Sequence, residues 1–303
     1  MSFHLLRASR SRGHRVSALM GLMASCAMLS ADTARADESP DAAVAGGPDR
    51  GRLEFVLGLG IAGIGQRASA TVAAETTIFR DPGRGAPIEP QFDPFGKSAN
   101  RDLVKGAIAL SSRLTGPKVE AIPSGPRLFV DAGLNLPLDG RATIASAEGL
   151  GPPSVREPFL YADARFHLRW FVGVGLEFVV PQSGWQLAVR PSVDYVGQSL
   201  TVRGVFDEEV RPVGLPNQTI ERTASDGLSH HGVGGRLALE AEMSEFGNWI
   251  PTLFVEVQAA YLFGDFDGRL DVVGTNWLTS YEYKFERIAG SASAGFRLKW
   301  RGL

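Results

Sequence analysis

The stretch that decides the fold is residues 160–180, LYADARFHLRWFVGVGLEFVV. Through this stretch every second residue is apolar, and the residues between them include Arg165, Arg169 and Glu177. A repeat of two is the repeat of a β-strand, whose side chains alternate between two faces, whereas a helix repeats every 3.6 residues. The stretch therefore predicts one long strand with an apolar face and a charged face.

Seven further segments of the chain show the same alternation: 52–65, 102–114, 126–138, 185–205, 229–244, 250–267 and 285–300. The phase slips near Gly197, where a β-bulge is expected. The apolar faces carry no charge, and the opposite faces are polar. Each segment is longer than the roughly 9–11 residues that a tilted strand needs to cross a bilayer. We therefore expect eight membrane-spanning strands.

The connections between these segments favour a membrane barrel over a soluble sandwich. Their lengths are 36, 11, 21, 4, 23, 5 and 17 residues, so long and short connections alternate. Outer-membrane barrels have long loops outside and short turns on the periplasmic side. The predicted fold is all-β, a closed antiparallel up-and-down transmembrane β-barrel of eight strands. Within the first connection, Ser69–Phe79 alternates weakly, and it either lengthens a hairpin above the membrane or adds a strand.

The composition excludes several classes of protein. The chain has 303 residues, with Lys+Arg 31 against Asp+Glu 33 and a formal net charge of -2, which excludes a broad basic surface for nucleic acid. No run of about 20 apolar residues occurs after the first 40 positions, as a helical membrane protein would require.

The first segment has the layout of a secretory signal peptide. Basic residues precede a short apolar stretch, and Ala34-Arg35-Ala36 offers a cleavage site. We expect a signal peptide at 1–36, a periplasmic lead-in at 37–51 and the barrel at 52–303. The single cysteine, Cys26, lies in the signal peptide, so cleavage would leave no thiol for catalysis, disulfides or metal binding.

Four residues near the C-terminus carry a resemblance to a known family. Ser293, Gly295, Leu298 and Trp300 place a polar residue, a glycine and two apolar residues at the spacing of a terminal β-signal. This pattern resembles the assembly signal of small bacterial outer-membrane barrels of the eight-stranded OmpA/OmpW type. The resemblance implies folding by the outer-membrane insertion machinery, an outer-membrane location, and contact with outer-membrane lipids and lipopolysaccharide.

Alternation would send the charged faces into the lumen of such a barrel. An eight-stranded barrel is just wide enough inside for side chains to fill, so charges of both signs should pair there. A lumen plugged by ion pairs is the main expectation, and a narrow or gated path is the alternative. The expected network is Glu54, Lys105, Arg113, Arg127, Asp131, Asp163, Arg165, Arg169, Glu177, Arg190, Asp194, Arg236, Glu240, Glu242, Glu256, Arg297 and Lys299, and His167 is expected as a neutral member.

The expected function is a structural, surface or small-solute transport role in the outer membrane, without catalysis, cofactor or metal. The alternative is a lipid A-modifying barrel enzyme of the acyl hydrolase type, with Ser229 and His231 as its weak catalytic candidates. Those enzymes keep a histidine and a serine near the outer leaflet, but their His-x-Ser spacing is absent here. A soluble lipocalin-like barrel is a third possibility, which the outward apolar face disfavours.

Overall fold

The computed structural model describes residues 53–76, 94–118, 125–138, 140–149, 158–182, 185–210, 216, 218–274 and 277–301. The expected signal peptide and most of the lead-in, including Cys26, lie outside these residues. The described residues form ten strands: β1 (Glu54–Thr76), β2 (Phe95–Lys118), β3 (Arg127–Pro137), β4 (Ala142–Glu148), β5 (Phe159–Gln182), β6 (Trp185–Val210), β7 (Gln218–Glu242), β8 (Trp249–Phe263), β9 (Asp267–Val273) and β10 (Trp277–Arg301). No helix in this part of the chain is long and apolar enough to cross a membrane.

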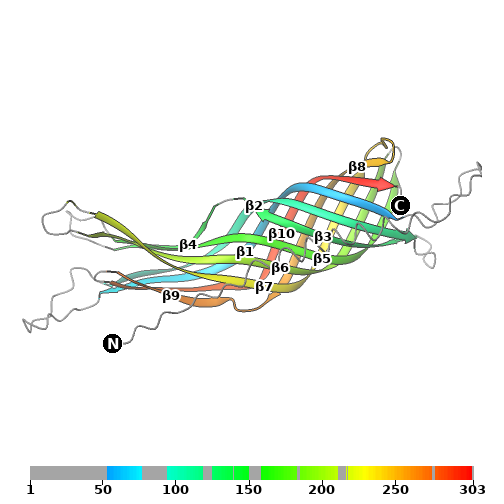
Figure 1. Ribbon diagram of the computed structural model, residues 1–303. Coiled ribbons are helices and arrows are strands. Elements are labelled where there is room, and N and C mark those ends of the chain that lie inside the picture. Colours follow the sequence, from blue (N-terminus) through cyan, green and yellow to red (C-terminus); the bar gives the residue numbers. More distant parts are fainter. Residues whose placement is uncertain are drawn as a thin grey trace, which may run out of the picture.

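Eight of these strands close into a ring. The order around the wall is β1-β2-β3-β5-β6-β7-β8-β10, and β10 pairs back onto β1. Every neighbouring pair is antiparallel, as the two-residue alternation predicted. The expected closed antiparallel barrel of eight strands is therefore confirmed. The closed ring lies at the right of Figure 1, at the end of the molecule where the C-terminus is marked.

The strands continue well beyond the length that a membrane requires. Six of the wall strands have 23 to 26 residues, so much of what the sequence assigned to long loops is β-strand (Figure 1). Strand β1, for example, pairs with both β2 and β10 as far as Ala74. The segment 69–76 thus lengthens an existing strand and adds none. The remainder of Ser69–Phe79 lies outside the described residues.

Two of the eight wall strands are broken, and the breaks change the architecture. The strand that begins as β3 leaves β2 after Pro137 and resumes as β4, which pairs with β5 alone. The strand that begins as β8 leaves β7 after Phe263 and resumes as β9, which pairs with β10 alone. The ring therefore divides above the breaks into two four-stranded sheets, β2-β1-β10-β9 and β4-β5-β6-β7.

A glycine with a positive φ angle lies at each break. Gly140 has φ 141° and Gly264 has φ 126°. L-residues rarely adopt such angles, whereas glycine adopts them without a steric penalty. The two glycines thus allow the chain to turn away from one neighbour while it keeps the other.

The two sheets pack face to face as a β-sandwich in the outer half. A Cβ on Gly204 of β6 would lie 2.5 Å from the ring of Tyr281 on β10, so the sheets are in direct contact. Phe206 and Trp277 also meet across the interface, with ring centroids 6.3 Å apart. The residues between the sheets form one apolar cluster that includes the fully buried Val72. We call this part of the molecule the sandwich half, and the closed ring below it the barrel half.

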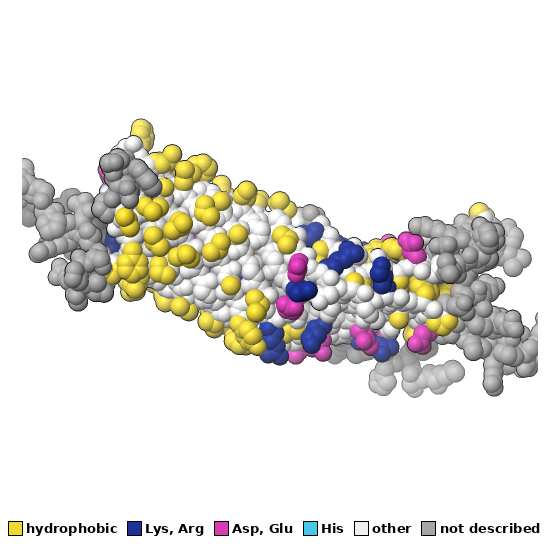
Figure 2. Space-filling view, turned by 180° about the vertical axis from the view of Figure 1, so that it is seen from behind, with side chains coloured by type: hydrophobic (Ala, Val, Ile, Leu, Met, Phe, Trp, Pro, Cys, Tyr) yellow, Lys and Arg dark blue, Asp and Glu magenta, His cyan; other side chains and the backbone are white. Residues whose placement is uncertain are grey.

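The outside of the barrel half is apolar. Exposed side chains on all eight wall strands form this belt, among them Leu59, Val104, Val130, Val174, Val193, Leu239, Val255 and Phe296. The belt spans 55–65, 104–114, 128–138, 170–180, 187–197, 233–243, 249–261 and 288–300, and no outward position in these ranges is charged. Figure 2 shows hydrophobic side chains over this half and charged side chains over the sandwich half. The belt is the membrane-spanning part.

A one-residue bulge in β5 changes which side chains face inward. Phe166 pairs with Leu200 and Leu168 pairs with Ser199, so His167 is the additional residue. The pairing of β6 with β7 runs through Gly197 without a shift. The slip expected near Gly197 therefore lies on the neighbouring strand. Because the side-chain repeat is two, a one-residue insertion exchanges the two faces above the bulge.

Candidate functional site: the charged core of the barrel

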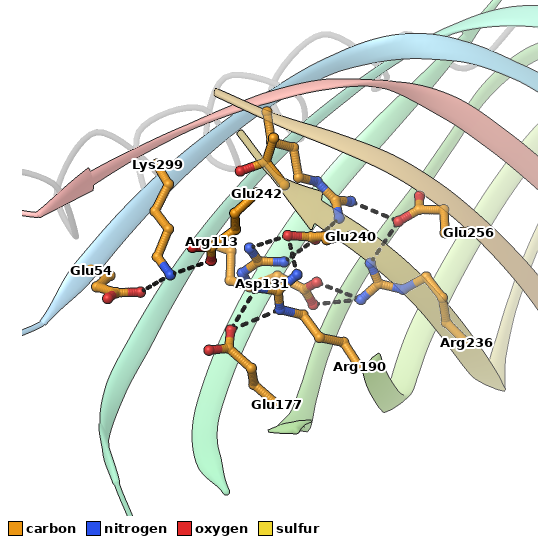
Figure 3. Close-up of polar contacts among 12 residues, drawn as sticks. Glu54, Arg113, Asp131, Glu177, Arg190, Arg236, Glu240, Glu242, Glu256 and Lys299 are labelled. Atoms are coloured by element: carbon orange, nitrogen blue, oxygen red, sulfur yellow. Dashed lines mark hydrogen bonds and ion pairs between the residues drawn. The ribbon is translucent and has the colours of Figure 1, made fainter. Parts of the chain in front are cut away.

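The interior of the barrel half holds seven cations and seven anions, contributed by all eight wall strands. They are Arg113, Arg127, Arg169, Arg190, Arg236, Arg297 and Lys299, with Glu54, Asp131, Glu177, Asp194, Glu240, Glu242 and Glu256. Each comes from an inward position of its strand, opposite the apolar belt. We call this set the charged core. Figure 3 shows ten of its members pointing toward one another.

Glu240 on β7 is the centre of the charged core. Its carboxylate accepts hydrogen bonds from Arg113 at 2.6 and 3.0 Å, and it also pairs with Arg190 and Arg297. The residue is only 1% exposed. Charge-assisted, bidentate bonds of this kind are among the strongest hydrogen bonds in proteins. Three strands that are not neighbours of one another are thus held to one carboxylate across the lumen.

Arg236, also on β7, forms a second centre one layer higher. Its guanidinium donates to both oxygens of Asp131 at 2.6 Å and to Asp194 at 2.9 Å. It also pairs with Glu256 at 3.4 Å and lies 4.2 Å from the ring centroid of Phe171. The arginine is therefore enclosed by three carboxylates and one aromatic face.

The lower end of the charged core joins the two ends of the described barrel. Lys299 on β10 lies 2.7 Å from both Glu54 and Glu242, and Arg127 lies 2.7 Å from Glu54. Arg190 connects this layer to Glu240, because it also binds Glu177 at 2.7–2.8 Å. The first and last strands are thus linked by side chains as well as by backbone pairing.

The upper end of the charged core is an amide layer. Arg169 donates to Gln258 at 3.0 Å and to the carbonyl of Gly290 at 2.9 Å. Gln258 donates in turn to Asp194 at 2.6 Å, and Gln198 donates to Gln66 at 2.7 Å. Above these amides the interior becomes apolar.

Sequence reasoning named the charged members but left out the uncharged ones. Gln66, Gln198, Gln258 and Ser293 are buried and bonded to the core or to its upper layer. The signal for them was present, since each lies on the inward phase of its strand. A search restricted to charge could not find them.

Inward glycines make room for the large charged side chains. A Cβ on Gly173 would overlap the carboxylate of Asp194 and would lie 3.1 Å from Asp131. Gly175 similarly faces the ring of Phe129 on β3. The alternating glycines of β5 are therefore part of the packing of the core.

Three charged residues and one histidine expected in the lumen lie elsewhere. Asp163, Arg165 and His167 fall at or above the bulge in β5, so the exchange of faces turns them outward. Arg203 donates to Asp163 at 2.9 Å, and burial raises the pKa of that carboxyl to about 6. Partial burial and then the charge of Arg165 lower the pKa of His167. Lys105 lies above the end of β3, where it donates to the carbonyl of Arg141 at 3.0 Å.

The two weak catalytic candidates face outward near the top of the belt. Ser229 is exposed, and the ring of His231 stacks on Tyr195 with centroids 6.0 Å apart. Trp170 lies 6.0 Å from the same histidine. Ser229 and His231 share no hydrogen bond in the part of the chain that the structure describes. His231 is therefore a member of an aromatic cluster of the type found at membrane interfaces.

The four residues of the expected assembly signal lie on β10. Ser293 faces inward and donates to Glu256 at 2.8 Å, and Gly295 packs against the backbone of Leu59 and Gly60. Leu298 faces the membrane, and Trp300 lies 6.2 Å from Trp249 at the lower border of the belt. Among the described residues, no cluster of three or more His, Cys, Asp or Glu has the arrangement of a metal site.

A closed eight-stranded wall, an uncharged apolar belt and a paired charged interior together define an integral outer-membrane β-barrel. No protein-family model matches the chain, and a search of curated proteins gives no match. Solved structures give remote similarities. Neisserial surface protein A is 10% identical, with 80% of this chain and 99% of that chain covered and a TM-score of 0.27.

Two other solved structures are similar to the chain at comparably low sequence identity. The outer membrane protein OprG from Pseudomonas aeruginosa is 12% identical, with 84% of this chain and 98% of that chain covered and a TM-score of 0.32. The attachment invasion locus protein of Yersinia pestis is 10% identical, with 78% and 98% covered and a TM-score of 0.21. The assignment to this class rests on the strand arrangement, the belt and the core.

Proposed function

We propose that the protein is a non-conducting anchor, which holds a rigid β-sandwich and its outer connections at the cell surface without catalysis. The observation that carries this proposal is that two different cores fill the interior, one above the other. The charged core fills the barrel half, and an apolar core fills the sandwich half directly above it. A hydrated ion on this axis would meet two different obstacles in sequence.

The lower obstacle is held in place by its own balance of charge. Seven cations face seven anions, and central members such as Glu240 and Arg190 are 1% exposed. A buried charge that loses its partner costs several kcal/mol, so the core resists the removal or displacement of any member. A solute would have to break several such pairs at once to pass.

The upper obstacle has the opposite chemistry. Val72, Ile144, Leu160 and Val202 are fully buried between the two sheets, so most of the lining of the outer half is apolar. An ion leaving the charged core would lose its hydration without gaining a partner. The combination favours a surface or structural role over transport.

The remaining parts of the proposal concern export of the protein and its insertion into the outer membrane. We include in it the signal peptide at 1–36, insertion by the outer-membrane machinery through the β10 pattern, and contact of the belt with outer-membrane lipids and lipopolysaccharide. The aromatic cluster around His231 supports a boundary at this level, since amphipathic rings prefer the membrane interface.

Conductance measurements in planar bilayers test the proposal. Refolded wild-type protein should give no stable channels, and neither should Arg169→Ala, because the apolar core above the charged core still blocks the axis. Arg165→Ala is the matched control, since that arginine is exposed and lies outside the core. Conductance of the wild type as large as that of a general porin would overturn the proposal. So would stable channels from Arg169→Ala that Arg165→Ala does not give, because the apolar core would then be no barrier.

A further inference from the structure

The two breaks in the wall leave the sandwich half with unpaired strand edges on opposite sides. On one side, residues 95–105 of β2 and all of β4 share no backbone pairing across the gap between them, within the part of the chain described, and only the side chain of Lys105 bridges its lower end, to the carbonyl of Arg141. The other side has the same arrangement. There is no backbone pairing in the described chain between residues 218–230 of β7 and β9. Unpaired edges are places where another chain can add, so proteins usually protect them.

The β2/β4 side, residues 95–105 and 140–149, is the basic edge. It carries four cations, Lys97, Arg101, Lys105 and Arg141, against two anions, Asp102 and Glu148. Lys97 and Arg101 are exposed although they lie on the inward phase of β2. Between them in the same phase, Ala99 packs against the apolar cluster. The edge position lets these two side chains reach out past the sheet.

The β7/β9 side, residues 218–230 and 264–273, is the acidic edge. It carries five anions, Glu221, Asp226, Asp265, Asp267 and Asp271, against two cations, Arg222 and Arg269. Asp265, Asp267 and Asp271 are exposed. Asp271 also pairs with Arg269 at 2.9 Å, a contact between two half-exposed side chains that water and salt weaken. The two edges thus have opposite net charge.

The spacing of the charges on the two edges matches as well. Lys97 and Arg101 are four residues apart on β2, as Asp267 and Asp271 are on β9. The rungs of the sheet between these strands place Asn100, next to Arg101, on the rung that ends at Asp267. They place Gly96, next to Lys97, on the rung that ends at Asp271. Each cation therefore has an acid one residue from its own level, on the opposite phase, because Asp267 and Asp271 lie on the outward phase of β9.

The bilayer fixes the direction of every strand in neighbouring copies of the chain. β2 runs toward the membrane and β9 runs away from it, so β2 of one upright copy and β9 of the next are antiparallel. The same holds for β4 and β7. Antiparallel edges can pair with closely spaced hydrogen bonds. Two basic edges or two acidic edges would instead repel each other, which excludes a symmetric pairing of like edges.

We propose that the sandwich half docks against a second copy of this chain, with the basic edge of one copy against the acidic edge of the next. Arg101 then lies one residue from the level of Asp267 and Lys97 one residue from the level of Asp271, and the long basic side chains reach these acids around the edge of the sheet. Because the contact joins two different surfaces, it repeats from copy to copy and generates rows or closed rings in the plane of the membrane. The charged core and its lack of conductance play no part in this inference.

Zero-length carbodiimide cross-linking of the full chain, refolded into neutral phospholipid vesicles, tests the proposal. The wild type should give a ladder of dimers and larger species, and the ladder should weaken at about 1 M salt, where the screening length is about 3 Å. Reversing the basic edge with Lys97→Glu and Arg101→Glu should reduce the cross-linked fraction by about tenfold, because like charges then meet. Reversing the acidic edge with Asp267→Lys and Asp271→Lys should do the same.

The combination of all four substitutions in one chain is the decisive arm. Both edges then change sign together, so the ladder should return. Glu75→Lys is the control, since Glu75 is exposed on β1, a central strand of the same sheet, where it pairs with Leu278 and not with an edge strand. A wild type without a ladder, or a ladder that neither reversal changes, would overturn the proposal. An effect of the basic-edge reversal alone, seen only in vesicles with anionic phospholipid, would assign the edge to lipid phosphate instead.

Discussion

The barrel half and the sandwich half are built from the same strands but have opposite interiors. In the barrel half the inward residues are charged, and Glu240 is 1% exposed while Leu59 on the outside is 60% exposed. In the sandwich half most inward residues are apolar, and Val72 is fully buried while most charged side chains face water. The two-residue alternation is common to both. It determines which residues share a face, and the surrounding medium determines which face can be apolar on the outside.

The difference has a simple physical basis. A lipid-facing surface must be apolar, so the polar face of each strand can only turn inward, where its charges must pair. In water the apolar face turns inward instead. Between the two regimes the chain replaces charged inward residues by amides such as Gln66 and Gln198, and then by alanine, valine and aromatic residues.

The largest effect is expected from breaking the charged core. Glu240→Gln leaves the core with seven cations and six anions, and three arginines lose their common carboxylate. Breaking a buried pair by removing one partner typically costs about 3–5 kcal/mol. We expect a loss of this size in the free energy of unfolding, measured by urea titration of the refolded protein.

Glu282→Gln is the control for that measurement. Glu282 lies on the outer face of the sandwich half, where its side chain is 63% exposed and pairs with Arg269 at 3.6 Å. An exposed pair contributes about 0–1 kcal/mol. Equal losses for the two variants would contradict the distinction between the paired interior and the wet exterior.

The outer surfaces of the two halves can be compared by introducing an arginine on each and measuring the change in stability. Val172→Arg puts a cation on the lipid face of β5 and should cost about 2–4 kcal/mol near the midplane. Thr71→Arg puts the same cation on the outward, water-facing side of β1 and should change stability by less than about 0.5 kcal/mol. Refolding yields and urea midpoints in lipid vesicles measure both. Tolerance of Val172→Arg would place the upper border of the membrane below this residue.

The smallest expected effect lies at the junction of the two halves. His230 is fully buried where β7 leaves β8, stacks on Phe266 at 4.2 Å, and contacts the carbonyl of Asp265 at 2.8 Å through Nε2. Desolvation lowers its pKa below the ordinary value of 6.5, although the Asp265 contact opposes this shift. The unfolded segment therefore takes up a proton at a higher pH than the folded one.

The direction of the pH effect follows from the lower pKa of His230 in the folded segment than in the unfolded one. The stability that neutral His230 gives to the junction is complete above pH 6.5 and is lost as the pH falls from there toward the folded-state pKa. Amide exchange in 264–273, corrected for intrinsic rates, should be faster at about pH 5 than at about pH 7.5. His230→Gln, which keeps a donor for the Asp265 carbonyl but does not titrate, should remove this dependence. A dependence that persists in that variant would assign it to another group, such as His167.

The sequence predicted the barrel better than the sandwich because the two halves leave patterns of different strength. In the barrel half, bulky apolar residues alternate with charges, as in the stretch after Trp170. In the sandwich half the inward residues of β1 are Ala68, Ala70, Val72 and Ala74, and the contrast with neighbouring serine and threonine is weak. Long loops were therefore assigned where strands continue.

Two local features could not be read from the pattern. The insertion at His167 is one residue long, and alternation continues on both sides of it, so Asp163 and Arg165 remained on the wrong face. The breaks at Gly140 and Gly264 look like ordinary turns in sequence, since nothing local says which neighbour a strand abandons. The composition of the charged core was largely predictable, whereas the partners of Glu240 depend on the register of non-neighbouring strands.

The continuity of the wall has a mechanical consequence. Six strands pass from the membrane into the sandwich half without a linker, and at about 3.3 Å per residue each is on the order of 80 Å long. A pull on the outer tip is therefore applied along the strands and is resisted in shear by many ladder hydrogen bonds at once. The load reaches the ion pairs of the barrel interior directly, so the barrel half and the sandwich half move together as one stiff body.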